Sequence, residues 1–279
     1  IGQDREWTIF CADAVIYLAG SQLQDCIYIC TECNDIIDIT RTSFNEHDKE
    51  SHNEKSPSKV KFYDWVYMTP GPGHIELNMS RSVLAFLWSP IIEHMSGLLG
   101  FRTPKAKAAI KAGGDHHRSK KILMALLDAL SKEILVSYVR SLETTDVPSV
   151  EGFYDWLKDC QSEQLFFFYD AAFNTILPLK LYTAATRKNN GKMMMAARVA
   201  FSHLFYVRRH PLYREVNLRD ILTRLKMPQE VFSFQLANES FSLSGVENTG
   251  QGPDFLQEQI NRLIKMFLPS GVITWRDWR

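Results

Sequence analysis

The chain has 279 residues, 45% of them hydrophobic, which is enough to bury a large core in one domain or two. Lysine plus arginine equals aspartate plus glutamate at 32 each, so the formal net charge is zero. A general electrostatic attraction to nucleic acid or to membranes is therefore excluded, and any basic surface must be local. No run of about 18 uncharged apolar residues is present, so we expect no membrane-spanning segment. Five cysteines, an odd number, favour a reducing compartment, the cytosol or the nucleus, over a disulfide framework.

The front of the chain predicts strands. Residues 7–17 are rich in β-branched and aromatic side chains and carry a single acid, Asp13, as expected for a buried strand that ends in a functional turn. Residues 26–33 and 62–69 are strand-like as well, and the polar stretch 44–61 between them predicts a loop or a small insert. The run Pro70-Gly71-Pro72-Gly73 ends the last of these strands, because its prolines and glycines force the chain out of a sheet.

From His74 onward, helical periodicity replaces the strand patterns. A helix over residues 75–100 is expected to bend at Pro90. The helix predicted over 119–140 has an apolar stripe that we expect to be buried: Leu123, Leu126, Leu127, Leu130, Ile134 and Leu135. Further helices are predicted over 149–159, 162–187, 192–207 and 218–225, and another short apolar stretch begins at Pro228. A loop over 238–253 leads to the last helix.

The last helix is predicted to begin at Pro253-Asp254 and to end before Pro269-Ser270-Gly271. Its polar and apolar positions repeat with the spacing of two opposite helical faces. The polar face carries Asp254, Glu258, Asn261 and Lys265, and the apolar face carries Leu256, Ile260, Leu263 and Phe267. Alone, this pattern indicates an amphipathic surface helix, and other segments must decide whether Glu258 has a further role.

Two cysteines and two histidines follow the spacing Cys30-x2-Cys33-x13-His47-x4-His52. Two thiolates and two imidazoles complete the tetrahedral coordination of a structural zinc ion, so this spacing predicts a zinc site that staples a loop. The alternative is a buried cysteine pair on a strand, followed by two histidines exposed in a polar loop. The segment lacks the full apolar pattern of a DNA-reading finger.

Two further clusters lie at predicted helix starts. His74 and Glu76 follow the strand that ends at the proline-glycine run, where α/β folds commonly place function, so they are candidates to contact a metal or a substrate. Glu76 is equally well explained as a first-turn carboxylate favoured by the helix dipole. Asp115 is expected to cap the next helix, and the adjacent His116 and His117 cannot share one helical face, which disfavours a joint metal role. No nucleotide-binding glycine loop, nucleophile elbow or His-Glu-x-x-His segment is present.

Together these residues resemble a group of eukaryotic transposon-derived proteins whose core is similar to the RNase H fold of Asp-Asp-Glu transposases. Three features carry the resemblance. Residues 7–17 look like the first strand with its acid at Asp13, residues 70–78 look like a Pro-Gly-x-x-His stretch after a later strand, and residues 254–265 look like an Asp-x-x-x-Glu-x-x-Asn-x-x-x-Lys helix. The match spans nearly the whole chain in order, although each motif is short.

The resemblance implies an α/β, predominantly helical chain in which an RNase H-like strand core is interrupted by a large all-α insertion. Residues 1–77 would form the first part of the core with the zinc-stapled loop at 30–52. Residues 78–250 would form the insertion, and residues 251–279 the terminal core helix and tail. DNA as partner and a nuclear location are implied by the same resemblance, with the cytoplasm as the alternative location. A homo-oligomer is a separate option that the resemblance does not decide.

The implied chemistry is two-metal phosphoryl transfer, in which carboxylates hold two Mg²⁺ ions about 4 Å apart. Carried over by position, Asp13 would be the first ligand, Glu258 the last and Glu76 the middle one. The family pattern has an acid just before the histidine, whereas this chain has Pro72-Gly73 there. The chain is therefore expected to be either a DNA strand-cleaving and strand-transferring domain or a noncatalytic descendant that acts as a DNA-associated or protein-interaction module.

Overall fold

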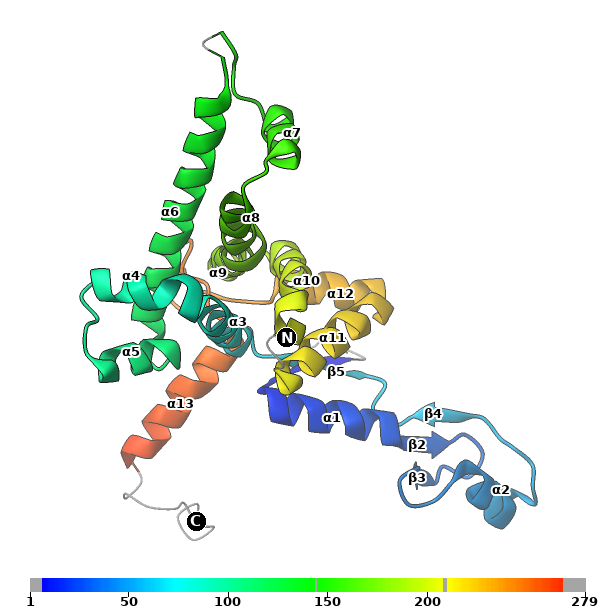
Figure 1. Ribbon diagram of the computed structural model, residues 1–279. Coiled ribbons are helices and arrows are strands. Elements are labelled where there is room, and N and C mark those ends of the chain that lie inside the picture. Colours follow the sequence, from blue (N-terminus) through cyan, green and yellow to red (C-terminus); the bar gives the residue numbers. More distant parts are fainter. Residues whose placement is uncertain (1–6, 144, 208–209, 268–279) are drawn as a thin grey trace.

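A pair of parallel strands lies beside helix α1 (Ala14–Cys26) in a mostly helical body in the computed structural model (Figure 1), which describes residues 7–143, 145–207 and 210–267. Strand β1 (Thr8–Ala12) pairs with β5 (Val66–Pro70) in a register that sets Thr8 opposite Val66 and Ala12 opposite Pro70. Both strands therefore end at the same edge, and the residues that follow them begin close together. The expectation of a predominantly helical α/β chain is confirmed.

The first predicted strand is too long. It ends at Ala12, and helix α1 (Ala14–Cys26) begins two residues later. Asp13 causes the change, because its Oδ1 accepts a hydrogen bond from the backbone N–H of Ile16 at 3.1 Å and so caps the helix. Ala14 and Tyr17 form the buried face of this helix, whereas Val15 and Ile16 are exposed.

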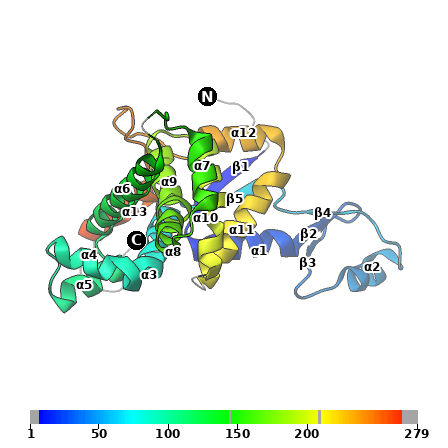
Figure 2. The same ribbon diagram turned by 45° about the horizontal axis from the view of Figure 1, so that its top comes forward.

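Residues 27–61 form a separate small unit, called the arm below, that extends from the body where α1 ends (Figures 1 and 2). Strands β2 (Ile27–Cys30), β3 (Ile36–Asp38) and β4 (Lys59–Lys61) form an antiparallel sheet in the order β3-β2-β4. Of the two alternatives for residues 44–61, a loop or a small insert, the structure agrees with the insert, because helix α2 (Phe44–His52) lies within it. Ser43 and Glu46 form a reciprocal capping box at its start. Residues 44–52 are polar because α2 is short and buries only one side, at His47 and Asp48.

The body contains the remaining helices. They are α3 (Pro72–Leu87), η1 (Trp88–Ile92), α4 (Glu93–Leu98), α5 (Pro104–Lys111), α6 (His116–Ser141), α7 (Val150–Asp159), α8 (Glu163–Tyr169), η2 (Asp170–Ile176), α9 (Leu177–Arg187), α10 (Gly191–Val207), α11 (Pro211–Lys226), α12 (Gln229–Ala237) and α13 (Pro253–Phe267). Helix α5 was not expected, and α11 is twice as long as predicted because Tyr213 and Val216 extend its buried side. The residues Pro269 to Gly271, predicted to end the last helix, lie outside the described residues.

Pro90 lies in a π-helical segment, η1, which separates α3 from α4, and the bend itself stays a prediction. Proline has no N–H to donate to the preceding turn, and a wider turn accommodates the missing hydrogen bond. The expected boundary between residues 77 and 78 falls inside α3, and the division of the chain into three parts remains a prediction. None of the helices within the described ranges is long and apolar enough to cross a membrane.

The core of the body lies between α3, α6, η2, α9 and α10, whose fully buried side chains include Met79, Leu123, Ile176 and Phe201. The stripe predicted on α6 is confirmed at five of its positions, from Leu123 to Ile134. It is wrong at Leu135, which is 48% exposed. Leu135 lies about 100° round the helix from Ile134 and so faces away from the core.

A buried set of charges ties α11 to the parallel strands. The guanidinium of Arg224 donates to Asp220 at 2.7 Å, to Thr69 of β5 at 3.1 Å and to Glu239. Asp220 is also paired with Arg198 of α10 at 2.6 Å. All four charged side chains are buried, and their charges balance. The hydrogen bond from the buried, ion-paired Arg224 to Thr69 therefore holds the end of β5 against α11.

Replacing Arg224 with methionine should lower the free energy of unfolding by about 3–5 kcal/mol, because Glu239 would be left buried without its cation. Chemical denaturation followed by circular dichroism measures the change. Lys158→Met is the matched control, since its pair with Asp155 is exposed and should contribute little. Similar small effects of both substitutions would contradict the structural role given to Arg224.

Candidate functional site

Asp254 and Glu258 both contact His74 near the end of the parallel strands. With Asp13, which follows β1 and acts on His74 through its charge alone, these residues form what we call the His74 site. Asp13 directly follows β1, and His74 lies in the first turn of α3, just after β5. Asp254 and Glu258 come from the first two turns of α13, about 180 residues later in the sequence. The topology therefore brings together segments from both ends of the described chain.

Asp254 makes the central contacts of this site. Its carboxylate accepts hydrogen bonds from the backbone N–H of Gly73 at 3.2 Å and of His74 at 2.9 Å, and it lies 2.9 Å from Nδ1 of the His74 ring. It is almost fully buried. Asp254 thus caps helix α3 from another helix, satisfying N–H groups that have no partner within α3.

The glycines of the proline-glycine run make this approach possible. A Cβ atom at Gly71 would lie 2.5 Å from Oδ2 of Asp254, and one at Gly73 would lie 3.0 Å from the same oxygen. A Cβ at Gly252, just before α13, would also collide with this carboxylate. The run therefore does more than end a strand, because it leaves room for a buried carboxylate.

The loop before α13 is fixed to the body before it reaches the site. Ser240 donates its hydroxyl to the carbonyl of Thr186 at 2.6 Å and its N–H to Asn189 at 3.0 Å. Farther along, the N–H of Gly250 donates to the carbonyl of Arg187 at 3.0 Å, and the Arg187 side chain donates back to Gly250 at 3.3 Å. These hydrogen bonds hold Ser240 and Gly250 against the end of α9 and the turn after it. They therefore fix the loop that leads to Asp254.

His74 is held between carboxylates. With Nδ1 on Asp254, its Nε2 lies 3.6 Å from Oε1 of Glu258. The hydrogen bond to Asp254 raises the pKa of His74 above its ordinary value; burial opposes this shift, and the charges of Asp254, Glu258 and Asp13 add to it. Asp13 and Glu258 are therefore both close enough to act on the imidazole electrostatically.

The pKa of Asp254 moves in the opposite direction. Burial alone would raise it, but the hydrogen bonds from the His74 side chain and from two backbone N–H groups hold it below its ordinary value. Asp254 was expected only as a position on a polar helix face. The sequence signal that could have identified it is the Pro253-Asp254 helix start opposite a glycine-rich helix start.

Glu76 faces a different set of partners. Its carboxylate lies 2.6 Å from Nζ of Lys120 and 3.5 Å from Nε2 of His116, both on α6. Burial would raise its pKa, but the hydrogen bond with His116 and the charge of Lys120 lower it to about 2. Glu76 nevertheless borders the same hollow of about 290 Å³ as His74, Asp254 and Glu258. No contact joins Glu76 to Asp13 among the residues that the structure describes.

The second site is the cysteine-histidine cluster in the arm. Cys30 ends β2, Cys33 lies in the turn after it, and His47 and His52 come from α2. Their ligand atoms all lie within 4.8 Å of one another. Sγ of Cys30 is 3.3 Å from Nε2 of His52, and Sγ of Cys33 is 3.6 Å from Nε2 of His47. The cluster could hold a metal such as zinc.

The alternative of two exposed histidines in a loop is wrong. His47 is buried and His52 is half-buried, and both lie on a helix. Nδ1 of His52 lies 3.5 Å from Glu32, the kind of outer carboxylate that commonly orients a metal-binding imidazole. Within the described ranges, this cluster is the group of three or more potential ligands that comes together closely enough for one ion.

Comparisons of the chain with protein-family models, with curated proteins and with solved structures find no match. The arguments for function therefore come from the two sites themselves.

Replacing Asp254 with asparagine should lower the pKa of His74, because the hydrogen bond to the Asp254 carboxylate is the largest cause of its rise. Titration of the His74 ring by NMR measures the pKa. Glu258→Gln is the matched control and should produce a smaller decrease, since Glu258 acts through its charge at a longer distance. Equal decreases, or none, would contradict the assignment of Asp254 as the main partner.

The same pair predicts how stability depends on pH. The contribution of Asp254 is present above the pKa of the unfolded carboxyl and is lost as the pH falls through its lower folded value. The contribution of His74 is present below the pKa of the unfolded imidazole and is lost as the pH rises through its higher folded value. The stability difference between wild type and Asp254→Asn should therefore be greatest between these two limits.

Proposed function

We propose that this chain is a transposase-like domain with an RNase H-like core, and that it carries out metal-dependent phosphoryl transfer on DNA with Asp13 and Glu258 as metal ligands. The supporting observation is that Glu258 of the last helix lies 3.6 Å from Nε2 of His74, near the edge at which both parallel strands end, and that Asp13 follows the first of these strands. Two of the three motifs that carry the resemblance, residues 70–78 and 254–265, contact each other at this site.

The donor set supports a hard divalent cation. Mg²⁺ takes oxygen ligands and is usually held by one or two carboxylates, with water and substrate phosphates completing its coordination. Asp13 and Glu258 are both exposed, so their oxygens are accessible to an ion and to DNA. When bound, Mg²⁺ would supply charge stabilisation of the phosphate and a more acidic attacking water or hydroxyl group.

His74 would hold or move a proton beside these carboxylates. Asp254 fixes Nδ1 of its ring, which leaves Nε2 directed toward Glu258. An imidazole in this position can take a proton from an attacking hydroxyl or return one to a leaving oxygen. Asp254 acts through His74, because its carboxylate is buried and already accepts three hydrogen bonds.

A second candidate function is that of a noncatalytic descendant that binds DNA or protein. The observation in its favour is the position of Glu76, whose ion pair with Lys120 and contact with His116 occupy the carboxylate proposed as middle ligand. In addition, Pro72-Gly73 replace the acid of the family pattern, and Gly73 provides space for Asp254. Two accessible carboxylates would then remain for the metal.

For the arm we propose a structural Zn²⁺ ion held by Cys30, Cys33, His47 and His52. With Zn–S and Zn–N bonds of about 2.3 and 2.0 Å, the sulfur-nitrogen edge of a tetrahedral site is about 3.5 Å. The two measured edges, 3.3 and 3.6 Å, are close to this value. Residues 27–61 carry seven acidic and five basic side chains, which supports a stapling role over DNA reading.

The phosphoryl-transfer proposal predicts Mg²⁺- or Mn²⁺-dependent nicking of supercoiled DNA by the wild type. Glu258→Gln should reduce the rate at least about 100-fold, because it removes a charged ligand while preserving shape. The matched control is Glu247→Gln, on an exposed loop, which should leave the rate unchanged. Equal nicking by wild type and Glu258→Gln would contradict the proposal, and absence of nicking by the wild type would favour the noncatalytic candidate.

The zinc proposal predicts about one zinc per purified chain, measured by elemental analysis. Cys33→Ser and His47→Asn should each lose the metal and make the arm sensitive to limited proteolysis, because the small sheet and α2 depend on the ion for their association. Cys160→Ser is the control, since Cys160 lies outside the cluster. The proposal fails if zinc content is the same in all four proteins or is negligible in the wild type.

A further inference from the structure

Helix α13 has an apolar face that the described chain does not cover. Ile260, Leu263 and Met266 are 47%, 54% and 73% exposed, although they belong to the most regularly amphipathic helix of the chain. The helix is held at its first turn by Asp254, against α3 and β1, and then extends away from the body (Figure 1). A face of this kind on a helix that carries a site residue indicates a docking surface.

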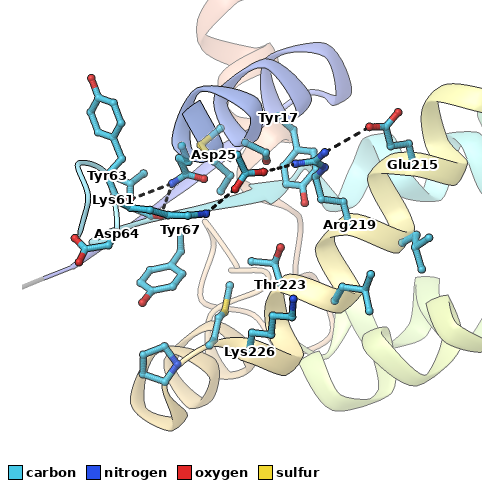
Figure 3. A pocket seen from close by; sticks show the side chains of 18 residues that line it. Tyr17, Asp25, Lys61, Tyr63, Asp64, Tyr67, Glu215, Arg219, Thr223 and Lys226 are labelled. Carbon is cyan, nitrogen blue, oxygen red and sulfur yellow. Dashed lines mark hydrogen bonds and ion pairs between the residues drawn. The ribbon is translucent and has the colours of Figure 1, made fainter. Parts of the chain in front are cut away.

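A groove of about 650 Å³ lies elsewhere, between α1, β5 and α11 (Figure 3). Val66, Tyr67 and Met68 of β5 line one side. On the other side, Leu218 and Leu222 of α11 are one helical turn apart and are 45% and 46% exposed. Aromatic and aliphatic side chains thus line an open groove that has no occupant among the described residues.

The charges at the groove are largely paired with one another. Asp25 accepts from Lys61 at 2.6 Å and from Arg219 at 3.0 Å, and Arg219 also lies 3.7 Å from Glu215, as the dashed lines in Figure 3 show. Lys226 and Asp64, which also line the groove, have no ion pair within the described ranges and carry opposite charges. A groove with a mixed lining, in which apolar side chains lie beside charges that are largely paired with one another, fits an amphipathic helix better than a small anion.

We propose that the apolar face of α13 docks into this groove on a second copy of the chain. One chain carries both open surfaces, and their apolar side chains are comparably exposed. Within one copy, α13 lies toward the side of α3, α4 and α5, whereas the groove lies toward the arm (Figures 1 and 2). The contact therefore joins two copies rather than closing one.

The charge and the symmetry favour such a pair. The formal net charge of zero removes the general repulsion that keeps strongly charged chains apart. Reciprocal docking, in which each copy supplies one helix and one groove, doubles the buried area toward the roughly 1,600 Å² typical of a stable complex. Arg262 of α13 is exposed, and its charge is complementary to that of Asp64, which lines the groove. This association does not depend on the metal chemistry proposed above.

The first test is the mass of the protein in solution, measured by analytical ultracentrifugation over the micromolar range. The wild type should be a dimer, and Leu263→Glu on the helix and Leu222→Glu in the groove should each yield a monomer. Val139→Glu is the matched control, because Val139 is 50% exposed on α6, away from both surfaces, and it should remain dimeric. A monomeric wild type, or a dimer that tolerates both glutamates, would overturn the proposal.

A second test separates docking from misfolding. A fluorescent peptide of residues 253–267 should bind the Leu263→Glu protein, whose groove is intact and vacated, with an affinity measured by fluorescence anisotropy. The same peptide should bind the Leu222→Glu protein at least about tenfold more weakly, while Val139→Glu combined with Leu263→Glu should bind it normally. Equal binding to all three proteins, or binding to none, would show that α13 does not occupy this groove.

Discussion

The carboxylate of Asp254 is the contact on which the arrangement of the site depends. Its three hydrogen bonds join the last described helix to the first turn of α3, and one of them also sets the tautomer and orientation of His74. Because burial of an unpaired carboxylate is costly, the contact requires all of these donors at once. The glycines around it, and the loop pinned near Arg187, are the structural conditions for that burial.

Local patterns in the sequence predicted much of the helical content, and the errors have local causes. Asp13 converts the end of a strand into a helix start, and the Ser43-Glu46 capping box creates α2 in a polar stretch. Both capping signals are visible in the sequence, but β-branched content and polarity were given more weight. A change in the helix at Pro90 was predictable, because proline acts on its own turn.

The two sites differ in how far apart their residues lie in sequence. The cysteines and histidines lie within 23 positions of one another, so spacing alone brought the right four residues together. The partner of His74 lies about 180 positions away, and that of Glu76 lies 44 positions away on α6. No periodicity encodes such pairings, which is why Asp254 was placed only on a helix face. The family resemblance gave Glu76 the role of middle metal ligand. In the structure its carboxylate is instead paired with Lys120 and contacts His116.

The anchoring of α13 by its first turn has a consequence for the order in which the structure forms. During synthesis, β1, β5 and the helical body emerge before Asp254, so until Asp254 docks, the N–H groups of Gly73 and His74 can bond only to water or to other groups. The loop that closes from residue 73 to residue 254 carries a large entropic cost, which is offset only after the body has folded and shortened the path. The His74 site is therefore a late product of folding, and its opening can occur locally while the core of the body remains intact.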